Sequence, residues 1–207
     1  MESLDNYIQA LNHLLQQELI DTKPILLSLQ PGEIIFHADE AAQHIFGVQT
    51  GKIQLVRYLE TGHISHQYGV ENGMWFGEDA LFNAVYQNSA IATQPSKIIA
   101  IPQHTFLTLL RHDPEISLIF VGQLAEQLYT AKTIMTLRCI RSAYARVLAY
   151  LNALKPSGKS TFVLNCSVKE IAEQICLTPE VVSRALRKLQ DDGIIQRHQR
   201  KVSFLKQ

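Results

Sequence analysis

Residues 168–189 read VKEIAEQICLTPEVVSRALRKL, and this segment combines two short helical patterns with a tight turn between them. The first pattern predicts a helix over 168–175, in which the small Ala172 would let a second helix cross closely. Thr178 suits an N-cap, and the proline that follows it suits the first position of a second helix, expected over 179–190. Two helices about a turn apart, followed by a β-hairpin, predict a winged helix-turn-helix.

The second helix of this pair has an apolar side and a polar side. Val182, Leu186 and Leu189 share the apolar side and predict the buried face. The polar side offers groups that can read base edges, because arginine bonds guanine in a bidentate manner and glutamate accepts from cytosine. The residues expected to contact bases are Glu180, Ser183 and Arg184. Those expected to contact DNA phosphates are Lys169, Thr178, Arg187, Lys188, Arg197, Arg200 and Lys201.

The distribution of charge supports a nucleic-acid partner, although the chain carries no net charge at pH 7. Residues 139–207 hold twelve lysines and arginines but five acidic residues, which leaves +7 in this part and −7 in residues 1–138. A basic C-terminal third on an acidic body is expected when one end of a protein faces a polyanion. A chance imbalance across solvated faces is the alternative at this point.

The rest of the C-terminal third fits the same motif. A helix is expected over 143–154, followed by a loop at Pro156-Ser-Gly and a short strand over 161–164. After the stop at Asp192-Gly193, the hairpin is expected to pair Ile194-Ile195 with the run 202–205.

A long helix is expected from Pro114 to Arg138, after a shorter helix over 105–111 that ends at Asp113-Pro114. Apolar residues spaced three and four apart form a heptad seam along it, namely Val121, Leu124, Leu128, Ala131 and Met135. A second apolar face carries Ile116, Ile119, Ile134 and Leu137. Two apolar faces need two partners, so we expect one face to pack on the chain's own N-terminal domain and the seam to pack on a second copy. Burial of both faces within one chain is the alternative.

The N-terminal half reads as a β-rich domain behind an amphipathic helix over 4–20. Turn signals such as Pro31-Gly32 and Thr50-Gly51 separate short β-rich runs, and this pattern predicts an antiparallel sandwich or roll. The runs are 34–36, 45–48, 53–58, 64–68 and 98–101. The expected fold class is therefore α+β, with a β-roll domain over 1–113, a dimerisation helix over 114–138 and a winged helix-turn-helix over 139–207.

Three motifs resemble those of the CRP/FNR transcription regulators. Glu180-Val-Val-Ser-Arg184 matches the E-x-x-S-R recognition motif of the FNR branch. Pro31-Gly-Glu-Ile-Ile-Phe36 resembles the P-G-x-x-x-F segment at the start of the family's β-roll, and Phe76-Gly-Glu-Asp-Ala-Leu-Phe82 resembles its phosphate-binding cassette, F-G-E-x-x-L-F. The resemblance covers nearly the whole chain.

This resemblance implies a cyclic-nucleotide-binding-like sensor domain and a homodimer on a palindromic operator. Glu180, Ser183 and Arg184 would contact base edges in half-sites similar to TTGA. Pro179 stands where the cAMP receptor branch has an arginine, so we do not expect that branch's TGTGA half-site. RNA polymerase is a further partner implied by this class, and activation or repression is not readable from the sequence.

The resemblance also implies an effector pocket, formed by Gly77, Glu78, Asn88, Ser89, Gln127 and Ala131. The family holds a cyclic-nucleotide phosphate with an Arg-Ser pair, but this chain reads Asn88-Ser89, and the long-helix hydroxyl position falls on Ala131. We therefore do not expect cAMP. Gln127 stands where 2-oxoglutarate sensors have an arginine, which disfavours that ligand as well.

We do not expect an iron–sulfur cluster or haem. No cysteine precedes Cys139, so a four-cysteine cluster in the sensor domain is excluded. The candidate haem ligands are surface or turn histidines by pattern, namely His37, His44, His63 and His66. The effector is either a different small molecule or absent.

Other classes of protein are not supported. The longest apolar-rich stretch, 116–125, is far shorter than the roughly 20 residues of a membrane span, and no signal peptide is visible, so a cytoplasmic protein is expected. The three cysteines lack metal-ligand spacing and are expected to be buried or half-buried free thiols. No catalytic motif is present, and the adjacent Glu78 and Asp79 would point to opposite faces of a strand. The main alternative to a DNA-binding regulator is a ligand-binding module whose winged domain contacts protein.

Overall fold

The computed structural model describes residues 4–17, 22–58, 64–156, 158–164 and 166–205. The chain packs as two compact units, Met1–Ala125 and Glu126–Gln207, and the division between them falls inside the longest helix. No helix in the described ranges is long and apolar enough to cross a membrane.

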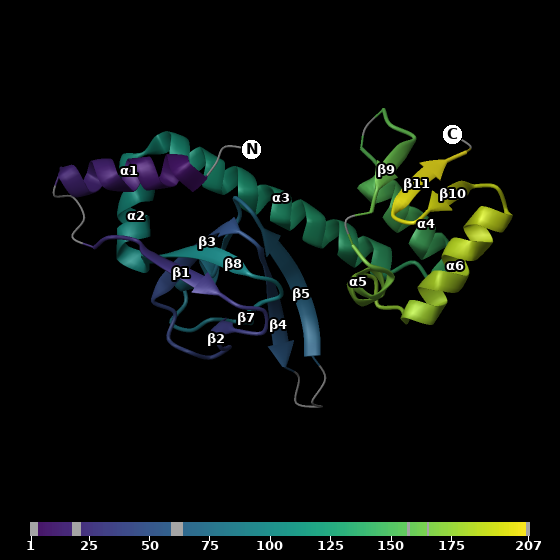
Figure 1. The fold of residues 1–207 in the computed structure, drawn as a ribbon, viewed down its shortest axis with the longest axis horizontal. Helices are drawn as coiled ribbons and strands as arrows, with labels where there is room; N and C mark the ends of the chain where they lie inside the picture. Colours follow the sequence, from purple (N-terminus) through teal and green to yellow (C-terminus); the bar gives the residue numbers. More distant parts are fainter. Residues whose placement is uncertain (1–3, 18–21, 59–63, 157, 165, 206–207) are drawn as a thin grey trace. The chain divides into compact units, whose positions relative to one another are not determined.

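Two four-stranded antiparallel sheets form the centre of the first unit (Figure 1). Their strand orders are β1-β8-β3-β6 and β2-β7-β4-β5. The strands are β1 (Ile25–Leu29), β2 (Ile34–Phe36), β3 (His44–Thr50), β4 (Lys52–Tyr58), β5 (Ile64–Glu71), β6 (Trp75–Phe76), β7 (Ser89–Ala92) and β8 (Ser96–Pro102). The five β-rich runs predicted from the sequence all lie within strands, which confirms the antiparallel roll, whereas β1, β6 and β7 were not predicted.

The hairpin between β3 and β4 requires glycine at its tip. Gly51 has a φ of 105°, and a Cβ there would lie 2.2 Å from the Ser96 Oγ. That hydroxyl accepts a hydrogen bond from the Lys52 N–H at 3.1 Å and donates one to the Gln94 carbonyl at 2.8 Å. The close approach therefore ties the β3–β4 hairpin to the start of β8, and any larger residue would break it.

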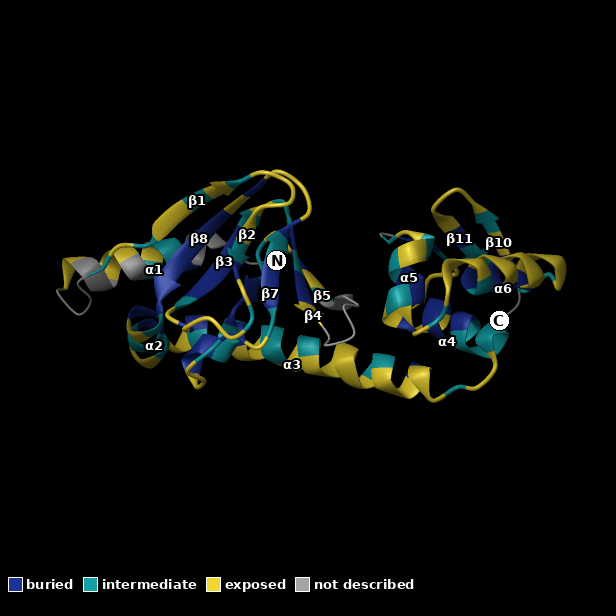
Figure 2. Cartoon of the chain, turned by 90° about the horizontal axis from the view of Figure 1, so that it is seen from below, coloured by how far each residue is buried: buried dark blue, intermediate teal, exposed yellow. Residues whose placement is uncertain are grey.

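Two apolar cores lie on either side of one sheet, because alternate residues of β3 and β8 belong to different cores. Figure 2 shows both strands mostly in dark blue, the colour of buried residues. The first core fills the space between the two sheets and includes Val48, Ile53, Val70, Phe76 and Ile98. The second core lies between the β1-β8-β3-β6 sheet and the helices, and it includes Tyr7, Trp75, Phe106, Ile116 and Phe120. The helices that supply it are α1 (Leu4–Gln16), α2 (Gln103–His112) and the first part of α3 (Pro114–Arg138). The helix predicted over 4–20 thus ends at Gln16, and positions 18–20 lie outside the described residues.

Gln123 of α3 joins this helix to the short strand β6. Its Oε1 accepts from the Trp75 N–H at 2.9 Å, and its Nε2 donates to the Trp75 carbonyl at 2.9 Å. The side-chain amide thereby takes both main-chain hydrogen bonds of Trp75 as a neighbouring strand would.

The two apolar faces of α3 have different surroundings. The seam is largely exposed in the single chain, with Val121 at 58%, Leu128 at 55% and Met135 at 66% exposure, although Leu124 is half-buried against the helical core. The cores of the two units therefore leave these three residues uncovered.

The second apolar face of α3 serves both units, which corrects the prediction that all of it packs on the β-roll. Ile116 is buried in the core beneath α1 and α2, and Ile119 packs against that core. Leu137 is buried in the core of the second unit instead, with Ile134 packed beside it. The C-terminal part of α3 therefore belongs to the helix-turn-helix unit.

The second unit contains α4 (Ala143–Leu154), α5 (Val168–Gln174), α6 (Pro179–Asp191) and a three-stranded antiparallel sheet of order β10-β11-β9. Its strands are β9 (Thr161–Val163), β10 (Ile195–His198) and β11 (Lys201–Phe204). All six elements were predicted to within two residues at each end, apart from β10, which extends to His198. The core includes Val147, Leu151, Ile171, Val182, Leu186, Ile195 and Val202. This is the expected winged helix-turn-helix.

Candidate nucleic-acid interface

The first helix of the motif, α5, begins with a complete capping box. The Ser167 Oγ accepts from the Glu170 N–H at 3.2 Å, and the Glu170 Oε2 accepts from the Ser167 N–H at 2.7 Å. These bonds satisfy N–H groups that the helix itself leaves without partners. Ile171 and Ala172 are buried on the inner face, as the sequence predicted.

A four-residue turn then leads to α6. Cys176 adopts a left-handed conformation with φ 51°, and the Leu177 N–H donates to the Ala172 carbonyl at 2.9 Å. Thr178 caps α6, because its Oγ1 accepts from the Val181 N–H at 3.4 Å. Pro179 occupies the first turn, where its missing N–H costs nothing. The predicted N-cap and its proline are confirmed, and they fix where α6 begins.

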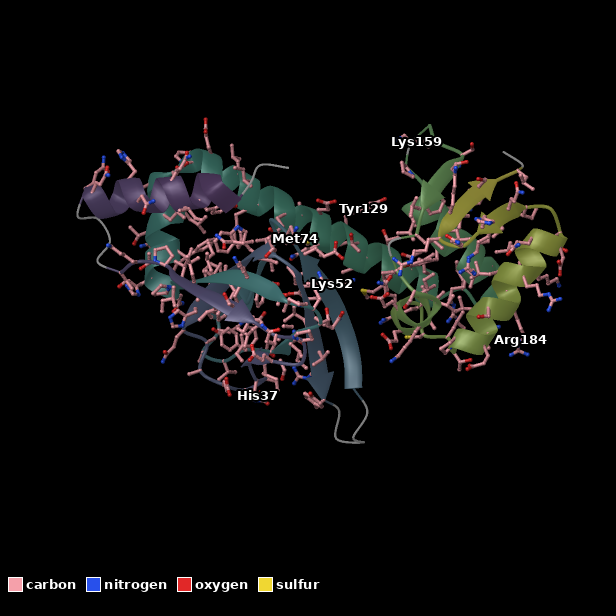
Figure 3. The ribbon with its side chains drawn as sticks, viewed as in Figure 1. His37, Lys52, Met74, Tyr129, Lys159 and Arg184 are labelled. Carbon is pink, nitrogen blue, oxygen red and sulfur yellow. The ribbon has the colours of Figure 1, made fainter. Side chains whose placement is uncertain are left out.

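Helix α6 separates its buried and exposed residues cleanly. Val182, Leu186 and Leu189 are buried, as predicted, together with Ala185. All three candidate base-contact residues are exposed, and they lie near the N-terminus of the helix, namely Glu180, Ser183 and Arg184. Figure 3 shows Arg184 projecting from α6 away from the rest of its unit. The N-terminal part of the helix therefore presents one acceptor, one hydroxyl and one guanidinium to solvent.

Glu180 is held in its charged form. A hydrogen bond from the Thr178 side chain lowers the pKa of this carboxyl, and its own backbone N–H and the Arg184 charge lower the pKa further. The ionised carboxylate offers acceptors alone, as an amino group on a base edge requires. Thr178 thus both caps α6 and keeps the Glu180 carboxylate ionised.

The candidate phosphate contacts surround this helix, and most are exposed. Lys169 on α5 lies 4.0 Å from Glu173, one turn further along. The Lys188 ammonium lies 5.6 Å from the centre of the Tyr144 ring, and the Tyr144 hydroxyl donates to Asp192 at 2.9 Å. Thr178 and Arg187 are exposed on the same motif. Since exposed pairs of this kind are weak, they leave the lysines available to a phosphate.

The wing supplies the remaining candidate phosphate contacts. Arg197 is half-buried, and its Nε donates to the Gln199 carbonyl at 2.9 Å, which helps to hold the tip of the hairpin. Gln199 has a left-handed conformation with φ 53°. Arg200 and Lys201 are exposed beside it. The turn therefore places Arg200 and Lys201 at the tip of the β10–β11 hairpin and Arg197 just before it.

The candidate effector residues of the β-roll are engaged by the chain itself. Gly77, with φ 75°, leads into a short 3₁₀ helix, Glu78–Leu81. The Glu78 Oε1 accepts from the Tyr68 hydroxyl at 2.8 Å, while the Oε2 is buried and has no hydrogen-bond partner among the described residues. Burial raises the pKa of Glu78, although its own backbone N–H and the Tyr68 hydroxyl oppose the shift.

The segment that would hold a phosphate is likewise occupied. Ser89 is buried, and its Oγ accepts from the Ala38 N–H at 2.9 Å, while Asn88 beside it is half-buried and uncharged. A cation does lie near this segment, because the exposed Arg57 of β4 donates to the Gln87 carbonyl at 2.6 Å. The last two candidate residues, Gln127 and Ala131, lie on α3 within the second unit, half-buried and exposed respectively.

Sequence reasoning missed three side chains that organise these sites. Tyr68 and Arg57 come from neighbouring strands of the roll, and their contacts depend on strand register, which no local motif specifies. Arg146 of α4 makes several hydrogen bonds to backbone carbonyls near the helix-turn-helix turn. In the sequence, Arg146 is one of twelve lysines and arginines in residues 139–207, and nothing in its local pattern indicates this role.

The cysteines are free but more exposed than predicted. Cys139 and Cys176 are exposed because they lie in the α3–α4 linker and the helix-turn-helix turn, whereas Cys166 is half-buried. Across the described residues, no group of three or more histidine, cysteine and acidic side chains is placed to hold a metal ion.

Two family models match the chain in the order of its two units. Residues 26–113 match the cyclic nucleotide-binding domain, and residues 145–206 match the Crp-like helix-turn-helix domain. The cyclic AMP receptor protein of Thermus thermophilus is 26% identical over 165 residues, which cover 79% of this chain and 76% of that protein. The probable transcriptional regulator flp of Lacticaseibacillus casei is 26% identical over 181 residues, covering 86% and 81%. The solved structure of FixK2 from Bradyrhizobium japonicum has the same fold, with a TM-score of 0.68 at 22% identity over 89% of this chain and 94% of that one.

The fold and the matched domains together define a DNA-binding transcription regulator of the CRP/FNR type. The chain carries a cyclic nucleotide-binding domain followed by a Crp-like helix-turn-helix domain. The relatives that it matches over most of their length include a probable transcriptional regulator and a cyclic AMP receptor protein.

Proposed function

We propose that two copies of this chain bind a two-fold-related operator, each with α6 in the major groove. The observation that carries this proposal is the division of α6: Val182 and Leu186 anchor it in the core while Glu180 and Arg184 remain exposed at its N-terminal end. A recognition helix of this motif reads base edges with its N-terminal residues. Half-sites about one helical turn apart would follow from the two-fold symmetry.

The contacts divide into two groups. Glu180, Ser183 and Arg184 read base edges, with Arg184 bidentate to guanine and Glu180 accepting from cytosine. The cations of α5, α6 and the wing bind phosphates, which set position and affinity but carry no base information. RNA polymerase is a further partner of the bound regulator, and the protein acts in the cytoplasm, where such operators lie.

The dimer forms through the seam of α3. Exposed side chains at 121, 128 and 135 repeat at heptad spacing, and a large exposed apolar stripe of this kind marks an interaction surface. A second copy of the same helix has the matching spacing, so an isologous pairing would bury both stripes.

The sensor domain does not respond to cAMP in this proposal. The Ser89 hydroxyl already accepts a main-chain hydrogen bond, and Asn88 contributes no charge where the family has an arginine. A titration of operator binding with cAMP should leave the affinity unchanged. A tenfold or larger increase in affinity, or about 1.4 kcal/mol, would overturn this part. The effector is a different small molecule, or the protein binds DNA without one.

Selection of bound sequences from a random DNA pool at fixed salt tests the main proposal. We expect enrichment of an inverted repeat, and competition with a scrambled duplex of equal length measures the preference. Repeating the selection with metabolite extract tests for an effector. If the protein shows no salt-dependent DNA binding and no preferred sequence, the winged domain contacts protein instead, which is the alternative function.

A further inference from the structure

Arg146 lies on the first turn of α4 and uses its guanidinium as a four-point clamp. Its Nε and Nη2 donate to the Ile140 carbonyl at 2.8 and 2.6 Å. Its Nη1 donates to the Ile175 carbonyl at 2.9 Å and to the Cys176 carbonyl at 3.2 Å. The side chain is half-buried, so these bonds are partly shielded from water. Charge-assisted bonds to two segments through one rigid plane fix their separation.

The two segments joined by Arg146 have separate roles. Ile140 lies in the linker between the end of α3 at Arg138 and the N-cap of α4 at Ser142. Ile175 and Cys176 form the first half of the turn that leads into α6. Both ends of the clamp lie in the second unit, Glu126–Gln207, so it does not depend on where the β-roll sits.

A second cation acts at the same place. Arg138, the last residue of α3, donates from its Nε to the Gln174 carbonyl at 3.0 Å. The last carbonyls of a helix lack intrahelical partners and carry partial negative charge, so arginine is well suited to bind them. Tyr150 of α4 adds a hydrogen bond from its hydroxyl to the Gln174 side chain at 2.7 Å. The C-terminal end of α5 is thus held at three successive residues.

We propose that Arg146 is the positioning residue of the recognition helix: it ties the α3–α4 linker to the helix-turn-helix turn and so fixes the position in space of the first turn of α6. This inference rests on the proposed function, because position matters through the bases that α6 reads. The two carbonyls at the turn precede the Thr178 cap by two and three residues, and Cys176 has a left-handed conformation that needs support. Without these hydrogen bonds the turn can adopt more conformations, so Glu180 and Arg184 no longer keep one orientation toward the bases.

The clamp also identifies a path from the dimer helix to DNA. The part of α3 from Glu126 onward shares a core with the helix-turn-helix through Leu137, and Arg146 closes the linker against the turn. Direct hydrogen bonds from Arg138 and Arg146 therefore join the end of α3 and its linker to the turn.

The test compares Arg146→Met and Arg146→Lys with two controls in the full-length protein. Arg141→Met removes an exposed cation of the same linker, and Val147→Ala reduces core packing on the same helix without touching the clamp. Anisotropy titrations measure affinity for the selected operator and for a scrambled duplex, and thermal unfolding reports stability. Hydrogen exchange reports the amides of the turn.

We expect Arg146→Met to lower operator affinity by roughly tenfold or more while scrambled DNA is bound as by Arg141→Met. The Leu177 amide should exchange faster, and Arg146→Lys should restore part of the preference. Val147→Ala should keep the operator preference even if it lowers the melting temperature as much as Arg146→Met does. If Arg146→Met keeps the wild-type ratio of operator to scrambled affinity, or loses no more of it than Val147→Ala at equal stability, the positioning role is wrong. If Arg146→Met does not fold, the ratio of operator affinity to scrambled affinity is measured for Arg146→Lys and judged in the same way. If the wild type shows no operator preference, the proposed function is refuted. The hydrogen-exchange rates of the turn amides in Arg146→Met and wild type would still test whether Arg146 holds the turn.

Discussion

Arg184→Ala removes an exposed guanidinium from α6 and leaves the buried face of the helix untouched. Alanine is a strong helix former, and substitutions at exposed sites change stability by about 0.5 kcal/mol or less, so unfolding should not change measurably. Loss of a bidentate pair with guanine should cost roughly 1–3 kcal/mol, or about 5- to 150-fold in affinity, at each half-site. A dimer that uses this arginine twice should lose about 2–6 kcal/mol, because distant sites contribute additively.

A double-mutant cycle with the DNA separates this loss from a general weakening. Wild type and Arg184→Ala are titrated at one salt concentration against the selected operator and against an operator whose guanine pair is replaced in both half-sites. The loss caused by the substitution should largely disappear on the altered operator. Arg187→Ala is the matched control, since it removes an exposed cation of the same helix that we assign to a phosphate; its effect should be the same on both DNAs. If Arg184→Ala weakens both operators equally, the base-reading role is refuted.

Three further predictions concern the wing, the dimer and the sensor domain. Lys201→Ala should weaken binding to every sequence and reduce the slope of log affinity against log salt by about 1; an unchanged slope would exclude a phosphate contact. Leu128→Arg places a charge in the exposed seam and should convert dimers to monomers in sedimentation equilibrium, whereas a wild-type mass would place the interface elsewhere. Burial raises the pKa of the Glu78 carboxyl above its ordinary 4.5, so the folded state binds the proton of this carboxyl more tightly than the unfolded state does. The protonated carboxyl therefore stabilises the fold fully below pH 4.5, and this stabilisation is lost as the pH rises through the raised pKa. Tyr68→Phe removes a hydroxyl that favours the ionised form, so urea unfolding should show a larger loss of stability from about pH 4 to about pH 8 than in wild type; an identical loss would contradict the coupling.

The helical parts of the fold were predictable because local signals coincided there. The bounds of α3 and α4 match the prediction residue by residue, since a proline starts α3 and a serine cap precedes α4. In α6 the cap, the proline and the apolar spacing all indicated the same helix, so both the buried face and the exposed face were predicted correctly.

Two of the three strands that were missed, β6 and β7, lack such signals. β7 consists of Ser89-Ala-Ile-Ala92, whose small residues are poor strand formers, and it is a strand because β2 and β4 pair with it on both sides. β6 has two residues, too few for any alternation. In both cases tertiary pairing determines the conformation and the local sequence does not.

The contacts around the candidate sites were beyond sequence reasoning for a similar reason. Tyr68 of β5 meets Glu78 at the start of the 3₁₀ helix, and Arg146 meets carbonyls that lie about thirty positions away along the chain. Backbone carbonyls have no residue signature, so a side chain that binds them resembles any other cation in a basic segment. The same limit explains the second face of α3, whose spacing did not reveal that it is shared between two cores.

The amide of Gln123 has a consequence for how this protein behaves at high concentration. By taking both main-chain groups of Trp75, it blocks the β6 margin of its sheet against strand addition by another molecule. The opposite margin of that sheet is β1, where Ile25 and Leu26 are exposed. Of the two margins of this sheet, β1 is therefore the one at which aggregation during expression or storage should begin, and Leu26→Lys should reduce it.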